Sequence, residues 1–151
     1  MTKRKISKVV RGQHAIDGAG VRLRRVLGLG TVKDFDPFLM LDGFDSTNPS
    51  DYVRGFPWHP HRGIETVTYL LSGEIDHGDS LGNSGTTNDL CCQWMTAGSG
   101  IIHQEMPRAS KRMLGCQLTV AQRPGGLQHP VQYASQLCDA HRRAASGHVA
   151  I

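Results

Sequence analysis

The feature that most constrains this chain is a pair of short motifs, in which His59 and His61, and later His103 and Glu105, are each separated by one residue. Pro60 sits inside the first motif, and proline disrupts a helix interior, so this motif must be extended. Side chains alternate between the two faces of an extended strand. Each motif therefore presents both of its ligand-type side chains on one face.

Two such strands, brought side by side, would direct three imidazoles and one carboxylate at a single point. Nitrogen and oxygen donors of this kind suit a divalent transition metal, and the set admits Fe, Mn, Ni, Cu or Zn. A six-coordinate metal held by four protein ligands keeps positions for water, oxygen or substrate. The sequence thus predicts a metal site formed by His59, His61, His103 and Glu105.

A second acidic candidate follows the first motif. If the strand continues past the histidines, Glu65 falls on their face, followed by Val67, Tyr69 and Leu71. We expect this face to line the inside of a small barrel. Glu65 is then the runner-up for a ligand, with a supporting or proton-handling role as one alternative and a simple hydrogen-bonded carboxylate as the other.

The remaining pattern predicts an all-β chain. A length of 151 residues suits one domain with its own core. Eighteen glycines and short apolar runs favour short strands and turns over long helices. Strands are expected at residues 6–10, 21–24, 38–41, 65–71, 90–95, 101–106 and 113–120. A polar loop region is expected at residues 78–88.

Several classes of protein are not expected. No apolar run reaches the length of a membrane span, and no signal-peptide segment follows the basic start. The four cysteines form no C-x-x-C pair, so neither a zinc knuckle nor a disulfide framework is indicated, and reduced thiols are expected. A soluble cytoplasmic protein that does not enter a membrane fits these features.

The chain is basic, with a net charge of +4, and eight of its 17 Lys and Arg lie within the first 25 residues. Such an excess can add a non-specific attraction to nucleic acid. No nucleic-acid-binding motif accompanies it. A solvated surface is therefore the favoured interpretation, and direct binding to nucleic acid is not expected.

The motifs resemble a known family. Residues 59–69 (HPHRGIETVTY) and 93–107 (QWMTAGSGIIHQEMP) are similar to segments of pirin, as are 36–39 (DPFL) and 17–21 (DGAGV). The resemblance covers about residues 5–118. The two signature motifs of the wider cupin superfamily are also approximated, by Gly55, His59, His61, Glu65 and Gly73, and by the run 100–103.

This resemblance implies a cupin double-stranded β-helix, which is a small antiparallel jelly-roll barrel, with Fe(II) inside. The ligands of the family correspond to His59, His61, His103 and Glu105, the same four residues that strand alternation selects. Fe(II) is accordingly the expected cofactor, with another divalent transition metal as the alternative. Glu65 corresponds to the ligand of many other cupins.

The resemblance fades after about residue 118. Pirins are similar to bicupins, in which a second barrel follows the first, and no such continuation is evident here. We expect a cupin domain at residues 1–120 and an atypical tail at 121–151, loosely ordered or with a short helix over 135–145. A natural one-domain variant, a truncation and a frameshift are all compatible with this pattern. An uncovered surface would favour partner docking or self-association.

Three functions follow from the resemblance. Pirins are similar to quercetin 2,3-dioxygenases, which open the central ring of a flavonol with oxygen. Glu105 would then be both ligand and general base, beside an apolar mouth that Phe56, Trp58 and Met106 could line. The alternative is a non-enzymatic, iron- and redox-responsive regulator that binds a transcription factor or a metabolic enzyme. A degenerate fragment is the third alternative.

Overall fold

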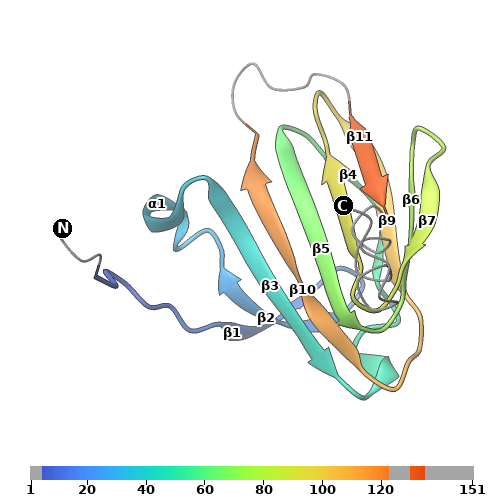
Figure 1. Cartoon of the computed structure of the whole chain (residues 1–151), viewed down its shortest axis with the longest axis horizontal. Coiled ribbons are helices and arrows are strands. Elements are labelled where there is room, and N and C mark those ends of the chain that lie inside the picture. The colour runs from blue at the N-terminus through green and yellow to red at the C-terminus, as the bar shows by residue number, and fades with distance from the viewer. Residues whose placement is uncertain (1–4, 123–129, 135–151) are drawn as a thin grey trace, which may run out of the picture.

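A computed structural model describes residues 5–122 and 130–134, which form two antiparallel β-sheets (Figure 1). The larger sheet has the order β1-β2-β3-β10-β5-β8-β11, and the smaller has the order β4-β9-β6-β7. The elements are β1 Gln13–Asp17, β2 Val21–Leu27, α1 Val32–Phe35, β3 Phe38–Ser46, the 3-10 turn η1 Pro49–Asp51, β4 Phe56–His61, β5 Ile64–Ser72, β6 Ile75–Asp79, β7 Ser84–Thr87, β8 Cys92–Thr96, β9 Ile101–Pro107, β10 Met113–Ala121 and β11 Val131–Ala134.

The all-β cupin jelly roll expected from the sequence is confirmed. Most of the expected strands are present, with bounds that differ by a few residues, as β2, β3, β5, β8, β9 and β10. The strand expected at 6–10 is wrong, because this segment has no regular structure, and Ile6 and Val9 are 85% and 75% exposed. Its apolar residues have no sheet to pack against, so alternation alone does not make a strand.

The tail is only partly described. Within residues 121–151, β11 pairs with β8 and so extends the larger sheet by one strand, which the sequence did not predict. The helix expected over 135–145 lies outside the described residues. The proposed division between a domain at 1–120 and a tail at 121–151 stays a prediction.

The interior of the two sheets is apolar at both ends and polar in the middle. One buried cluster contains Leu70, Ile75, Met113 and their neighbours, and a second contains Met95, Ala97 and Ile101. Along β9, Ile101 of the second cluster is followed on the same face by buried His103 and Glu105. The predicted ligands therefore lie in a polar layer that two apolar clusters enclose.

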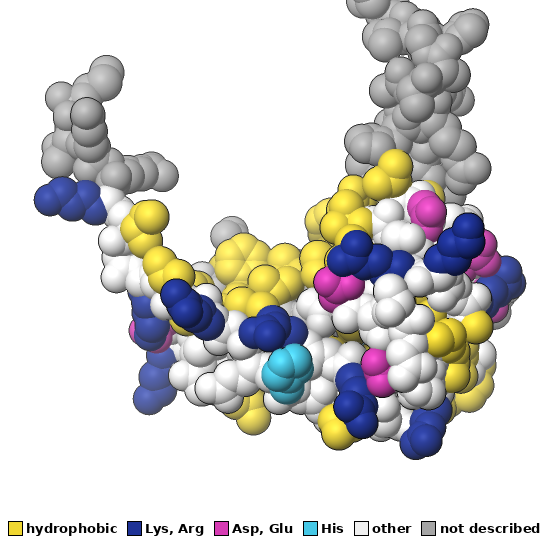
Figure 2. All heavy atoms as spheres, turned by 90° about the horizontal axis from the view of Figure 1, so that it is seen from below, with side chains coloured by type: hydrophobic (Ala, Val, Ile, Leu, Met, Phe, Trp, Pro, Cys, Tyr) yellow, Lys and Arg dark blue, Asp and Glu magenta, His cyan; other side chains and the backbone are white. Residues whose placement is uncertain are grey.

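The surface carries dispersed charge. Figure 2 shows Lys and Arg side chains spread over one face of the molecule, with acidic side chains among them. Arg108 pairs with Glu74 and Asp76, and Arg112 pairs with Asp45. Paired charges of both signs are typical of a solvated surface.

Two further expectations concern helices and cysteines. Among the residues that the structure describes, no helix has the length and apolar character needed to cross a membrane. Cys92 and Cys116 are free thiols, as expected. Cys91 is joined in a disulfide, so the expectation of reduced thiols is wrong at this position.

Candidate metal site

Strands β4 and β9 bring the three predicted histidines together. β4 lies at the edge of the smaller sheet, which its two prolines allow, because an edge strand does not need every backbone donor. His59 stands directly opposite His103 in the antiparallel pair, and His61 stands opposite Ile101. The potential ligand atoms of the three imidazoles all lie within 4.8 Å of one another. Alternation thus places them on one face, as the sequence predicted.

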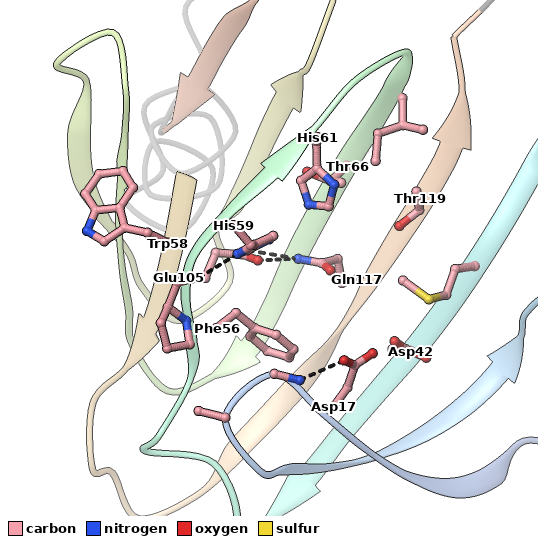
Figure 3. Close-up of a pocket in the computed structure, with 15 residues that line it drawn as sticks. Asp17, Asp42, Phe56, Trp58, His59, His61, Thr66, Glu105, Gln117 and Thr119 are labelled. Carbon is pink, nitrogen blue, oxygen red and sulfur yellow. Dashed lines mark hydrogen bonds between the residues drawn. The ribbon is translucent and has the colours of Figure 1, made fainter. Parts of the chain in front are cut away.

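The orientation of His59 is fixed by its own strand. Its Nδ1 lies 2.8 Å from the carbonyl oxygen of Pro57 (Figure 3). A carbonyl oxygen can only accept, so Nδ1 carries the proton and Nε2 keeps its lone pair for a ligand bond. Metal-binding histidines are commonly held by such a hydrogen bond from the second ring nitrogen.

His103 provides the test of whether these residues suit a metal. Its side chain is only 1% exposed, and neither of its ring nitrogens has a hydrogen-bond partner among the described residues. A buried polar group without a partner costs free energy, so it needs an explanation. The rings of His59 and His61 lie beside it, with centroids 4.4 and 5.0 Å away. Three converging imidazoles with this unmet bonding capacity fit a divalent transition metal.

The protonation of the histidines favours the same role. Burial, together with repulsion from His103 and His59, lowers the pKa of His61 from 6.5 to about 4, although Glu105 opposes the shift. Burial and repulsion from His59 likewise lower the pKa of His103 to about 4, against the attraction of Asp79. Both rings are therefore neutral near pH 7. Neutral imidazole is the form that binds a metal.

Glu105, the fourth predicted ligand, is buried, but it does not belong to the group of ligand atoms that lie within 4.8 Å of one another, and other residues hold its carboxylate. Thr68 donates from Oγ1 to Oε1 over 3.0 Å. Gln117 donates from Nε2 to Oε1 over 2.9 Å and to Oε2 over 2.8 Å. Each carboxylate oxygen has two lone pairs, so these contacts leave one free acceptor position, on Oε2. Glu105 can offer that position to a metal or to a proton, one at a time.

The two residues that hold Glu105 belong to a polar row across the larger sheet. Gln117 on β10 stands opposite Asp42 on β3 and opposite Thr68 on β5. Thr68 in turn stands opposite Gln93 on β8, and Asp42 stands opposite Arg25 on β2. Directly opposed residues point to the same face, so these five side chains form one line beneath the smaller sheet.

The outer end of this row is an ion-pair network. Arg25 contacts both oxygens of Asp42, at 2.9 and 2.8 Å, and one oxygen of Asp17 at 2.6 Å. The hydrogen bond from Arg25 lowers the pKa of Asp17, and the backbone N–H of Gly18 acts in the same direction. Both carboxyl groups line the pocket described next, so the charge of Arg25 offsets theirs there.

A pocket of about 480 Å³ opens onto His59, His61 and Glu105 (Figure 3). Phe56 lines it, as predicted for an apolar mouth. Trp58 also borders it, but its indole ring lies beside Gly78 on the outer face of the smaller sheet, 55% exposed and turned away from the histidines (Figure 3). Met106 is not among the lining residues. It follows Glu105 on β9, so alternation turns it to the opposite face. The volume lies within the range of small-molecule sites.

The structure does not bring Glu65 to the site. Its carboxylate accepts a hydrogen bond of 3.0 Å from Nε1 of Trp94 on the outer face of the larger sheet. The barrel face expected for Val67, Tyr69 and Leu71 is also wrong, because Thr66, Thr68 and Leu70 are the buried residues of β5. A turn at Gly63, with φ of 67°, separates β4 from β5 and resets the alternation.

Sequence reasoning missed Gln117 and Thr68. Gln117 lies inside a strand that was predicted correctly, where a long polar side chain between Cys116 and Leu118 was a signal of an inward polar contact. The sequence could not show that Gln117 and Thr68 would lie opposite each other, because the pairing of β10 with β5 depends on a register that the local pattern does not give.

Comparisons with known proteins identify the family of the chain. The family model described as Pirin matches residues 20–120. A pirin-like protein of Caulobacter vibrioides is 54% identical over 121 residues, which cover 80% of this chain and 44% of that protein. A Pseudomonas aeruginosa protein named as a candidate quercetin 2,3-dioxygenase is 59% identical over 110 residues, which cover 72% of this chain and 39% of that protein. This chain thus spans less than half the length of these relatives.

Two solved structures show the same relationship. A quercetin 2,3-dioxygenase of Acinetobacter baumannii matches with a TM-score of 0.70 and 30% identity, over 86% of this chain and 48% of that chain. The bacterial pirin YhhW of Escherichia coli, in complex with nickel(II), matches with a TM-score of 0.62 and 25% identity, over 85% of this chain and 58% of that chain. The motifs, the fold and the family model agree, and this chain belongs to the pirin family.

Proposed function

We propose that this chain binds a divalent transition metal, Fe(II) in the cell, through His59, His61, His103 and Glu105. The observation that carries the proposal is the buried His103 ring, whose two nitrogens have no hydrogen-bond partner among the described residues although two further imidazoles converge on it. Ni(II) is a suitable laboratory substitute, since the related pirin YhhW is a nickel(II) complex.

The proposed activity is the opening of a flavonol by molecular oxygen. Related proteins carry quercetin 2,3-dioxygenase names, and the pocket of about 480 Å³ suits a flat aromatic molecule against Phe56. When bound, the metal would act as a Lewis acid that lowers the pKa of the flavonol hydroxyl. Glu105 is the proposed general base, and its carboxylate would leave the metal to accept that proton, because the one free lone pair on its Oε2 serves either role but not both at once.

The pocket walls supply the remaining requirements. Phe56 would orient the flat substrate and displace water from it. The neutral imidazoles of His61 and His103 need not lose a proton to act as ligands at pH 7.

The cytoplasmic location and the alternative regulatory role with a protein partner stay predictions. No contact among the described residues favours the regulatory role.

Oxygen uptake with quercetin and Fe(II) tests the proposed activity. We expect the wild-type chain to consume oxygen, and Glu105→Ala to be about 100-fold slower or more, because a general base contributes at least that factor. Glu65→Ala is the matched control. It removes the same group from β5 in the larger sheet, where the carboxylate contacts Trp94 outside the site, and should keep wild-type uptake. Wild-type uptake no faster than that of Glu105→Ala would disprove the activity.

A further inference from the structure

Gln117 and Thr68 contact Glu105 in a way that restricts what this carboxylate can do. The Thr68 hydroxyl donates to Oε1 over 3.0 Å and accepts an N–H of Gln117 over 2.9 Å. The other N–H of Gln117 is shared between Oε1 and Oε2 of Glu105, at 2.9 and 2.8 Å. Every donor of this closed three-residue network is used, so it fixes the rotation of the carboxylate about its own axis.

The network also selects one oxygen. Oε1 accepts from both Thr68 and Gln117, which uses its two lone pairs. Oε2 accepts only from Gln117, so it alone retains a lone pair. The contacting residues lie on the larger sheet, whereas Glu105 and His103 share an inward face of β9 in the smaller sheet. Gln117 therefore holds Glu105 from the opposite side of the interior.

From this geometry we infer that Gln117 and Thr68 are positioning residues, which make Glu105 a one-oxygen ligand through Oε2. The inference rests on the proposed metal site and extends it, because it assigns roles to two residues on the other sheet. A carboxylate freed from these contacts could rotate, bind through both oxygens or turn away from the histidines. Hydrogen-bonded partners of metal ligands typically change metal affinity about 10- to 100-fold when they are removed.

Ni(II) titration by calorimetry, with Co(II) absorption spectra as a second readout, tests the inference on the full chain. Gln117→Met keeps the length of the side chain and removes both donors, and Thr68→Val keeps the shape and removes the hydroxyl. We expect each to weaken Ni(II) binding about 10- to 100-fold. Each should also shift the visible Co(II) bands toward those of Glu105→Ala, because the bands report the coordination geometry.

Two variants serve as matched controls. Gln93→Met makes the same change at a buried glutamine of the same polar row, whose amide has no hydrogen-bond partner among the described residues. Thr68→Ser keeps the hydroxyl that Thr68→Val removes. Both should keep the wild-type Ni(II) affinity and Co(II) spectrum. Thermal unfolding of each metal-free variant shows whether it is folded.

The outcomes separate the inference from the proposed function. If Gln117→Met and Thr68→Val bind and absorb like the wild type while Glu105→Ala does not, the inference is wrong and the metal site stands. If Glu105→Ala also matches the wild type, Glu105 is not a ligand and the inference is wrong, although a three-histidine site survives. A folded wild-type chain that binds no Ni(II) would overturn both.

Discussion

His103 shows at the level of a single residue why this interior is built for a ligand. A buried imidazole normally satisfies at least one nitrogen with a protein group, since an unmet hydrogen bond costs about 1–3 kcal/mol. His103 is 1% exposed, and no described residue hydrogen-bonds to it. The neighbouring rings of His59 and His61 make no hydrogen bond to it. A shared metal would satisfy all three rings.

The histidines predict how the stability of the metal-free chain depends on pH. Their pKa values of about 4 in the folded chain, for His61 and His103, lie below the 6.5 of an unfolded histidine. Between these values the unfolded state binds protons that the folded state does not. The free energy of unfolding should therefore fall as pH is lowered from about 6.5 to about 4.

Urea denaturation of the metal-free chain at several pH values in this interval measures the effect. His61→Gln and His103→Gln each remove one of the two titrating rings, so each variant should lose less stability on acidification than the wild type. Carboxylates that titrate at lower pH remain in every variant and cancel in the comparison. An identical pH dependence in wild type and both variants would contradict the lowered pKa values.

Strand β4 is the element on which the site depends, and Gly55 sets its distance from β9. Gly55 has a φ of 60°, and a Cβ there would lie 2.6 Å from the carbonyl oxygen of Glu105. We expect Gly55→Ala to lower the free energy of unfolding by about 1–3 kcal/mol, because the added methyl group overpacks this contact. By moving β4 away from β9, it should also weaken Ni(II) binding.

Gly63→Ala is the control for Gly55→Ala. Gly63 has a similar φ of 67°, but a Cβ there would meet nothing within 4 Å. Gly63→Ala should lower the free energy of unfolding by about 1 kcal/mol, which is the backbone strain of a left-handed alanine. It should leave the affinity for Ni(II) unchanged. Chemical denaturation and calorimetry measure both quantities. Equal losses of affinity in the two variants would show that the contact with Glu105 does not position the site.

The same elements show what the sequence could predict. Alternation within β4 and within β9 correctly grouped the histidines, because each motif lies inside one uninterrupted strand. It failed for Glu65, because the turn at Gly63 sends β5 into the other sheet and reverses the faces. Periodicity is a local signal, and it carries no information across a break of this kind.

At the scale of the whole molecule, the site is formed where two sheets face each other. β4 and β9 of the smaller sheet supply the histidines and Glu105, and β5 and β10 of the larger sheet supply Thr68 and Gln117. The cupin fold and the family could be predicted because their motifs are long and contiguous. The Glu105–Gln117 contact could not, since it depends on sheet packing and strand register between distant segments.

The central claim is that the histidine cluster holds a metal, and elemental analysis of the size-fractionated chain tests it most directly. The measurement compares the wild type with a His59→Ala/His103→Ala double variant, both produced with iron in the medium. We predict close to one equivalent of iron, or of another divalent transition metal, in the wild type and almost none in the double variant. A well-folded wild-type chain without metal, or a double variant that keeps its metal, would contradict the claim.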